Sequence, residues 1–150
     1  MSIDNIAAKW EGTPHRPGLQ TPKVGVDCIR FVDEVLREYG DHKWGCLPRW
    51  AQDGAFHNPR VLARIIALCE KRWDCHEISP PYFFQTGDLI CVSQSRNPFH
   101  IGIVGDDNRV VWHSGAIGVM RTSVQALSTN KFNIRRVYRP RAFERSGDEA

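Results

Sequence analysis

The stretch HIGIVGDDNRVVWH, residues 100–113, has the pattern of a β-hairpin. Its arms, His100–Val104 and Val110–His113, are short and rich in β-branched residues, which is typical of strands. Between them, residues 105–108 read Gly-Asp-Asp-Asn, a sequence that favours a turn. The stretch therefore predicts two antiparallel strands that each carry one histidine.

The register of this hairpin decides where the two histidines lie. If two or four residues form the loop, Val104 pairs with Arg109 and His100 lies directly opposite His113. Their Cβ atoms would then be about 5 Å apart on one face of the sheet. A loop of odd length, or a bulge, would shift the pairing by one residue and separate the two rings. We expect the directly opposed arrangement, because it also puts the apolar residues of both arms on the other face.

Upstream of the hairpin, a cysteine opens a predicted helix. Apolar residues recur at helical spacing from Cys28 onward, and Gly40 closes the pattern. Asp27 is a suitable N-cap for this helix. The unpaired N–H groups and the dipole of a helix N-terminus favour a thiolate, so we expect Cys28 to be an activated thiol. A structural cysteine that faces the core is the alternative.

Two histidines and a cysteine together suit thiol chemistry. One imidazole would take the proton of Cys28, and the other would hold the first ring in the correct tautomer and position. The same three side chains are also a known zinc-binding set. A second set that could contribute to a zinc site comprises Cys69, Cys75 and His76. Because structural zinc sites usually show two close ligand pairs, we expect no metal and no other cofactor.

The rest of the chain completes an α+β pattern. Helices come first and an antiparallel meander of about five strands follows, which indicates an α+β domain. Residues 41–57 show no clear pattern and are interpreted as a loop or a broken helix. The other predicted elements are a short helix in residues 1–10, a helix from Asn58 to about Trp73, and strands at 89–93, 118–122 and 134–138.

Composition places few further limits on function. The 150 residues, 41% hydrophobic and 25% charged, fit one soluble domain, and no apolar run approaches the roughly 20 residues of a membrane span. The net charge of +3 is too small to indicate nucleic-acid binding, and we interpret the arginines near the C-terminus as solvated. The N-terminus lacks the pattern of a secretory signal, so we expect synthesis in the cytoplasm. Five cysteines, an odd number, argue against a disulfide framework.

Several motifs in this order resemble one family. They match the NlpC-type cell-wall peptidases, named for NlpC and for the sixty-kilodalton invasion-associated protein. The resemblance spans roughly residues 9–120, apart from an unmatched insertion at about 41–85. The matching stretches are Trp10-Glu11-Gly12-Thr13-Pro14, Val26-Asp27-Cys28, Gly87-Asp88-Leu89-Ile90, His100-Ile101-Gly102-Ile103-Val104 and Val111-Trp112-His113-Ser114-Gly115.

The resemblance implies a fold, a site and a substrate. It implies one papain-like domain over residues 1–150, with Cys28 as nucleophile, His100 as general base and His113 as the orienting member. The expected activity is hydrolysis of peptide-stem amide bonds in bacterial peptidoglycan, typically between D-glutamate and a diamino acid. The short members of the family suggest a phage tail component, with tail-tip proteins as partners and a virion location. A catalytically idle tail protein and a thiol acyltransferase remain alternatives.

Two departures from the family pattern concern substrate recognition. Ile29 and Arg30 stand where the family usually has Ser-Gly, and His15 stands where it often has Tyr. Because these positions shape recognition in the family, we take His15, Asp27 and Ile29 as candidate substrate-binding residues. Arg30 is expected to point away from the site as a solvated surface charge, since adjacent helix positions do not share a face.

Overall fold

The computed structural model describes residues 2–40, 47, 64, 66–93, 100–129, 133–141 and 143. Its centre is a six-stranded antiparallel sheet with the order β3-β8-β4-β5-β6-β7, and a separate hairpin pairs β1 with β2. The elements are α1 (Ile3–Ala8), β1 (Gln20–Thr21), β2 (Gly25–Val26), α2 (Cys28–Gly40), the π-helix η3 (Leu68–Arg72), β3 (Cys75–Ile78), β4 (Leu89–Ser93), β5 (His100–Val104), β6 (Val110–Gly115), β7 (Gly118–Ser123), α4 (Val124–Thr129) and β8 (Asn133–Pro140).

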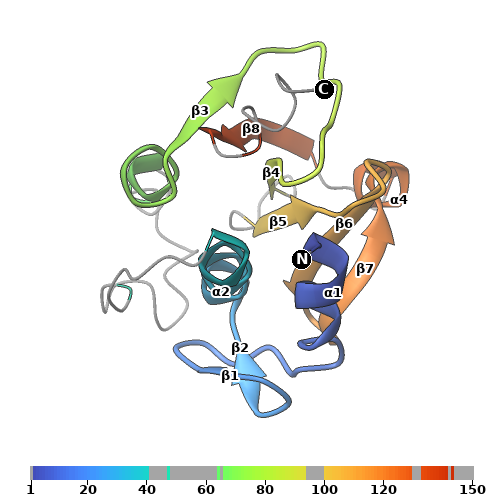
Figure 1. Ribbon diagram of the computed structural model, residues 1–150. Coiled ribbons are helices and arrows are strands. Elements are labelled where there is room, and N and C mark those ends of the chain that lie inside the picture. The colour runs from blue at the N-terminus through green and yellow to red at the C-terminus, as the bar shows by residue number, and fades with distance from the viewer. Residues whose placement is uncertain are drawn as a thin grey trace.

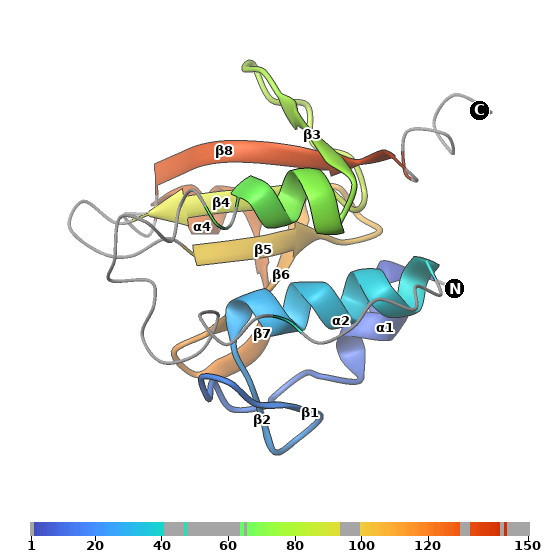
Figure 2. The same ribbon diagram turned by 90° about the vertical axis from the view of Figure 1, so that its left-hand side faces the viewer.

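The helices lie on both faces of the sheet, and the larger group lies on one face (Figures 1 and 2). Elements α1, α2 and η3 pack on the face that carries Leu89, Ile101 and Ile103. The opposite face is covered by α4, whose Leu127 joins a smaller apolar cluster with Ile90, Val92, Val104 and Val111. The predicted α+β class is confirmed, and the main core lies between α2 and the sheet.

Helix α2 begins and ends where the sequence predicts. Asp27 caps it, because Oδ1 accepts the N–H of Arg30 at 2.9 Å and the Asp27 carbonyl accepts the N–H of Phe31 at 2.9 Å. Phe31, Val32 and Val35 have no exposed surface. Burial of each such side chain contributes about 1.5–3 kcal/mol, so this apolar stripe holds α2 against the sheet.

Five strands were predicted and all five are present, but the sheet has a sixth. Strand β3 was missed because Cys75–Ile78 is a short edge strand whose two central residues, His76 and Glu77, are polar and break the alternation typical of a strand. Strand β8 does not extend the meander beyond β7. It returns to lie between β3 and β4, where Tyr138 pairs with both Glu77 and Leu89.

The register of the β5–β6 hairpin differs from the expected one. Val104 pairs with Val111, and the N–H of Gly105 donates to the carbonyl of Val110 at 2.8 Å. The expected pairing of Val104 with Arg109 is therefore wrong by two residues. Gly105 and Val110 continue the ladder, so the loop begins after Gly105 and ends before Val110. A shift of two residues keeps every side chain on its predicted face, since side chains alternate with a period of two.

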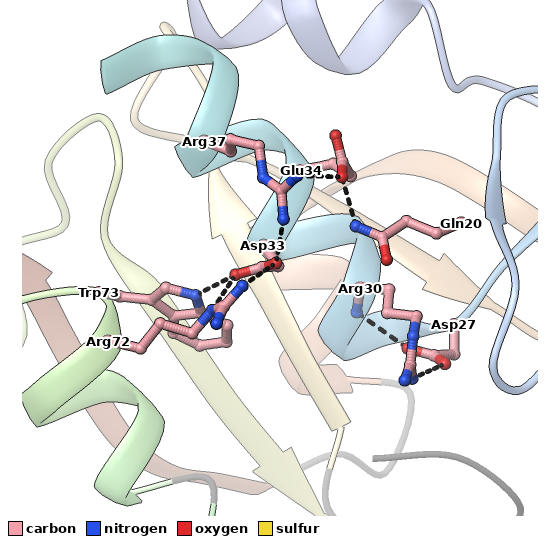
Figure 3. Close-up of polar contacts among 8 residues, drawn as sticks. All are labelled: Gln20, Asp27, Arg30, Asp33, Glu34, Arg37, Arg72 and Trp73. Atoms are coloured by element: carbon pink, nitrogen blue, oxygen red, sulfur yellow. Dashed lines mark hydrogen bonds and ion pairs between the residues drawn. The ribbon is translucent and has the colours of Figure 1, made fainter. Parts of the chain in front are cut away.

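The segment before β3 is attached to α2 by a buried carboxylate (Figure 3). Asp33 has no exposed surface and accepts the indole N–H of Trp73 at 2.7 Å. It also accepts two hydrogen bonds from Arg72, at 2.8 and 3.0 Å. The predicted helix does end at Trp73, whereas its residues 58–63 and 65 lie outside the described residues. So does the unpatterned stretch 41–57, apart from Leu47.

Three of the arginines near the C-terminus are paired with acidic residues along and beside β8. The pairs are Arg136 with Glu77 at 2.9 Å, Arg139 with Asp88 at 2.8 Å and Arg141 with Asp74 at 3.1 Å. Arg139 is mostly buried in this pair, so the expected solvated cluster is wrong for this residue. Among the described helices, none is long and apolar enough to cross a membrane.

Candidate active site

Cys28 lies where the N-terminus of α2 meets the first residues of β5. It is 2% exposed, and the backbone N–H groups of Ile101, Ile29 and Cys28 itself approach the thiol. Burial raises the pKa of Cys28, the charge of Asp27 raises it further, and the three N–H groups oppose both effects. The field of the helix terminus, which was expected to favour the thiolate, is therefore outweighed by the loss of hydration of this buried thiol.

The two strand histidines form a hydrogen-bonded pair. Nε2 of His100 lies 2.9 Å from Nδ1 of His113, with the rings edge to face at 84°. The predicted juxtaposition is thus confirmed, although the residues are diagonal rather than opposite neighbours. Burial, followed by the charges of His113 and His15, lowers the pKa of His100 to about 3. Burial lowers the pKa of His113 to about 4, so both rings are neutral near pH 7.

The hydrogen bond between two neutral imidazoles constrains their tautomers. One ring must donate and the other must accept. If His100 donates from Nε2, its Nδ1 bears a lone pair that can take a proton, and His113 holds the ring in that orientation. His100 would then be a base with a fixed tautomer. The next residue of the chain is Ile101, and its N–H approaches the Cys28 thiol.

The candidate substrate-binding residues at the start of α2 make internal contacts, and Figure 3 shows those between Asp27 and Arg30. Both oxygens of Asp27 are occupied: Oδ1 caps the helix, and Oδ2 accepts from the N–H of Gly18 at 2.9 Å and from the Arg30 guanidinium at 2.8 Å. Ile29 has no exposed surface and belongs to the core. Arg30 is 3% exposed, so the expected surface charge is wrong, because its pairing with Asp27 draws it into the protein.

His15 is brought to the same region by the chain that precedes β2. It forms an isolated parallel bridge with Val26, two residues before Cys28. Nδ1 of His15 lies 3.1 Å from Oγ of Ser114, which donates to the carbonyl of Val26 at 3.0 Å. Ser114 was not singled out as a site residue. Its place directly after His113, within the matched stretch of residues 111–115, was the available signal.

Neither of the two zinc sets considered as alternatives is brought together as a candidate metal site in the described residues. In the part of the chain that the structure describes, no group of three or more His, Cys, Asp or Glu side chains has a spacing that could hold a metal ion. The second set also divides between two environments: Cys69 and Cys75 are buried in the core, whereas His76 is partly exposed on the edge strand β3.

The two lowered histidine pKa values predict a loss of stability in acid. Below about pH 6.5 the unfolded chain takes up protons on both rings, but the folded chain does so only near pH 3–4. The free energy of unfolding is therefore highest above pH 6.5 and falls as the pH drops toward 4. Buried His113 alone accounts for on the order of 3 kcal/mol of this loss.

Denaturant unfolding of wild type and His113→Asn between pH 7.5 and 4 measures this effect. We expect the variant to show a shallower decline in the free energy of unfolding. His76→Asn, on the edge strand β3, is the control and should follow the wild-type slope. Identical slopes for wild type and His113→Asn would show that protonation of His113 does not oppose folding.

Comparison with known proteins gives one informative relative. No family profile matches the sequence. The chain is 30% identical over 124 residues to a protein of Escherichia coli (strain K12) described as a probable endopeptidase NlpC. The alignment covers 81% of this chain and 66% of that protein, just under two thirds of its length. The chain is thus similar to an NlpC-type endopeptidase, and its α+β fold is consistent with a papain-like architecture.

Proposed function

We propose that the protein is a cysteine endopeptidase that hydrolyses peptide-stem amide bonds of bacterial peptidoglycan. The observation that carries the proposal is the 2.9 Å contact between His100 and His113, together with the approach of the Ile101 N–H, on the residue after His100, to the thiol of Cys28 at the start of α2. The similarity to a probable endopeptidase supports the hydrolase class. The spacing of motifs along the chain supports the assignment of nucleophile, base and orienting residue to Cys28, His100 and His113.

In the proposed reaction the thiol and the base start as neutral groups. Burial raises the pKa of Cys28 and lowers that of His100, so a preformed thiolate–imidazolium pair is disfavoured. Nδ1 of His100 takes the thiol proton as sulfur attacks the scissile carbonyl, and the N–H groups at the start of α2 lie near the developing charge. The imidazolium then protonates the leaving amine, which leaves a thioester. Water, deprotonated by His100, hydrolyses the thioester and restores the thiol.

Incubation with purified peptidoglycan tests this function directly. Wild-type protein should release muropeptides with a new amino terminus and a new carboxyl terminus, identified by mass spectrometry. Fragments cut in the glycan strand, or acyl transfer to an added amine without hydrolysis, would count against the proposal. An unchanged substrate after long incubation at several pH values would also count against it.

The place of action that we propose is a phage tail, where the enzyme would open the wall during genome entry. This part of the proposal depends on the likeness of the sequence motifs to those of short tail-associated family members. It predicts tail-tip proteins as partners. Mass spectrometry of purified virions should detect the chain with the tail-tip fraction, and its absence from virions would contradict this placement.

Unequal losses are expected when the two histidines are replaced one at a time. His100→Ala should lower kcat/KM by about 10³-fold or more, because it removes the group that accepts the thiol proton. His113→Ala should retain more activity, and His113→Asn more again, because an amide oxygen can still accept from His100. His76→Ala should leave kcat/KM unchanged. Equal rates for wild type and His100→Ala, measured on one stem peptide, would remove His100 from the mechanism.

A further inference from the structure

The two hydrogen bonds of Ser114 fix the protonation of a neighbouring histidine. Oγ of Ser114 lies 3.0 Å from the carbonyl oxygen of Val26 and 3.1 Å from Nδ1 of His15. A carbonyl oxygen can only accept, so the single hydroxyl proton of Ser114 points toward Val26. Nδ1 of His15 must then donate to the serine oxygen. Neutral His15 therefore carries its proton on Nδ1 and has a lone pair on Nε2.

The reverse arrangement is unfavourable in this environment. If Ser114 donated to His15, its oxygen would face the Val26 carbonyl at 3.0 Å with no proton between the two atoms. Ser114 has no exposed surface, so water cannot relieve that repulsion. The Nδ1–H tautomer of His15 is the one that satisfies both contacts.

The position of His15 is fixed by the backbone as well. The N–H of Val26 donates to the carbonyl of Pro14 at 3.0 Å, and the N–H of Arg16 donates to the carbonyl of Val26 at 3.2 Å. His15 is therefore held on both sides by the residue that lies two positions before Cys28. Its charge also acts on His100, which places the ring within electrostatic reach of the proposed base.

We propose that Ser114 is a positioning residue that holds His15 in its Nδ1–H tautomer, so that Nε2 accepts a hydrogen bond from an N–H group of the substrate. The proposed substrate supplies such groups as the amide and amine N–H of a stem peptide, so this second part rests on the proposed function. The tautomer of a histidine is set by the hydrogen bond that its other nitrogen makes. Ser114 thereby turns His15 into an acceptor at this subsite.

Nitrogen NMR tests the tautomer without any need for turnover. In ¹⁵N-labelled protein at about pH 8, long-range ¹H–¹⁵N correlations should show His15 protonated at Nδ1. In Ser114→Ala the pattern should move toward protonation at Nε2. Ser93→Ala, which removes another buried strand hydroxyl, should leave His15 unchanged. Wild-type His15 protonated at Nε2 would overturn the proposal, whether or not Ser114→Ala folds.

Binding measurements test the contact with substrate. A stem peptide should bind Cys28→Ala with a Kd that rises about three- to tenfold when Ser114→Ala or His15→Phe is added, the loss expected for one hydrogen bond. An unchanged Kd in both double variants, or no binding to Cys28→Ala, would overturn the substrate contact. Peptide that binds normally but is never cut by wild type would instead refute the peptidase function and leave the role of Ser114 standing.

Discussion

Cys28→Ala should release no muropeptide from purified peptidoglycan above the background of a blank incubation. The substitution removes the sulfur that forms the acyl-enzyme in the proposed mechanism, and loss of a catalytic nucleophile lowers kcat by about 10³-fold or more. The fold should survive, because alanine also suits the buried first turn of α2 and the lost sulfur contacts cost on the order of 1 kcal/mol. Fragment release followed by mass spectrometry measures the first effect, and denaturant unfolding measures the second.

Cys91→Ala is the matched control for this experiment. Cys91 is also a buried cysteine, 1% exposed, but it lies on β4 in the core and outside the proposed site. It should lose a similar amount of stability and keep its wild-type rate. Fragment release by Cys28→Ala at the wild-type rate would show that another residue is the nucleophile, and the proposed mechanism would be abandoned.

Asp33→Ala should destabilise the protein by on the order of 3–5 kcal/mol, the usual result of removing one partner from a buried ion pair. The substitution would leave the indole N–H of Trp73, which is 4% exposed, without its acceptor. It would also remove the 2.8 Å contact of the mostly buried Arg72 guanidinium. Urea unfolding measures this change in the free energy of unfolding, from the midpoint of the transition and the slope of stability against urea concentration.

Glu34→Gln, at the next position of α2, separates this effect from a general loss of helix charge. Glu34 is about one quarter exposed and lies 3.7 Å from Arg37, so the change should cost less than about 1 kcal/mol. Similar costs for Asp33→Ala and Glu34→Gln would show that the attachment of η3 to α2 does not depend on the buried carboxylate.

The extent of α2 and the positions of five strands could be predicted from the sequence. These elements carry local signals: the Asp27 cap, the helical spacing that ends at Gly40, and short β-branched runs between turn residues. The pairing of His100 with His113 could also be predicted, because the period of two along a strand keeps both rings on one face even though the register was wrong by two residues.

The sequence by itself determined which residues lie on which face of each element, since that depends on spacing within a few turns of the chain. Only the tertiary structure decided what surrounds each polar group, since those neighbours come from distant segments. Cys28 shows the difference: the helix start was predicted, but the burial that raises its pKa comes from packing against the sheet. Three other features likewise depend on contacts that no local pattern encodes. They are the ion pair of Arg30 with Asp27, the position of β8 between β3 and β4, and the hydrogen bonds by which Ser114 joins His15 to Val26.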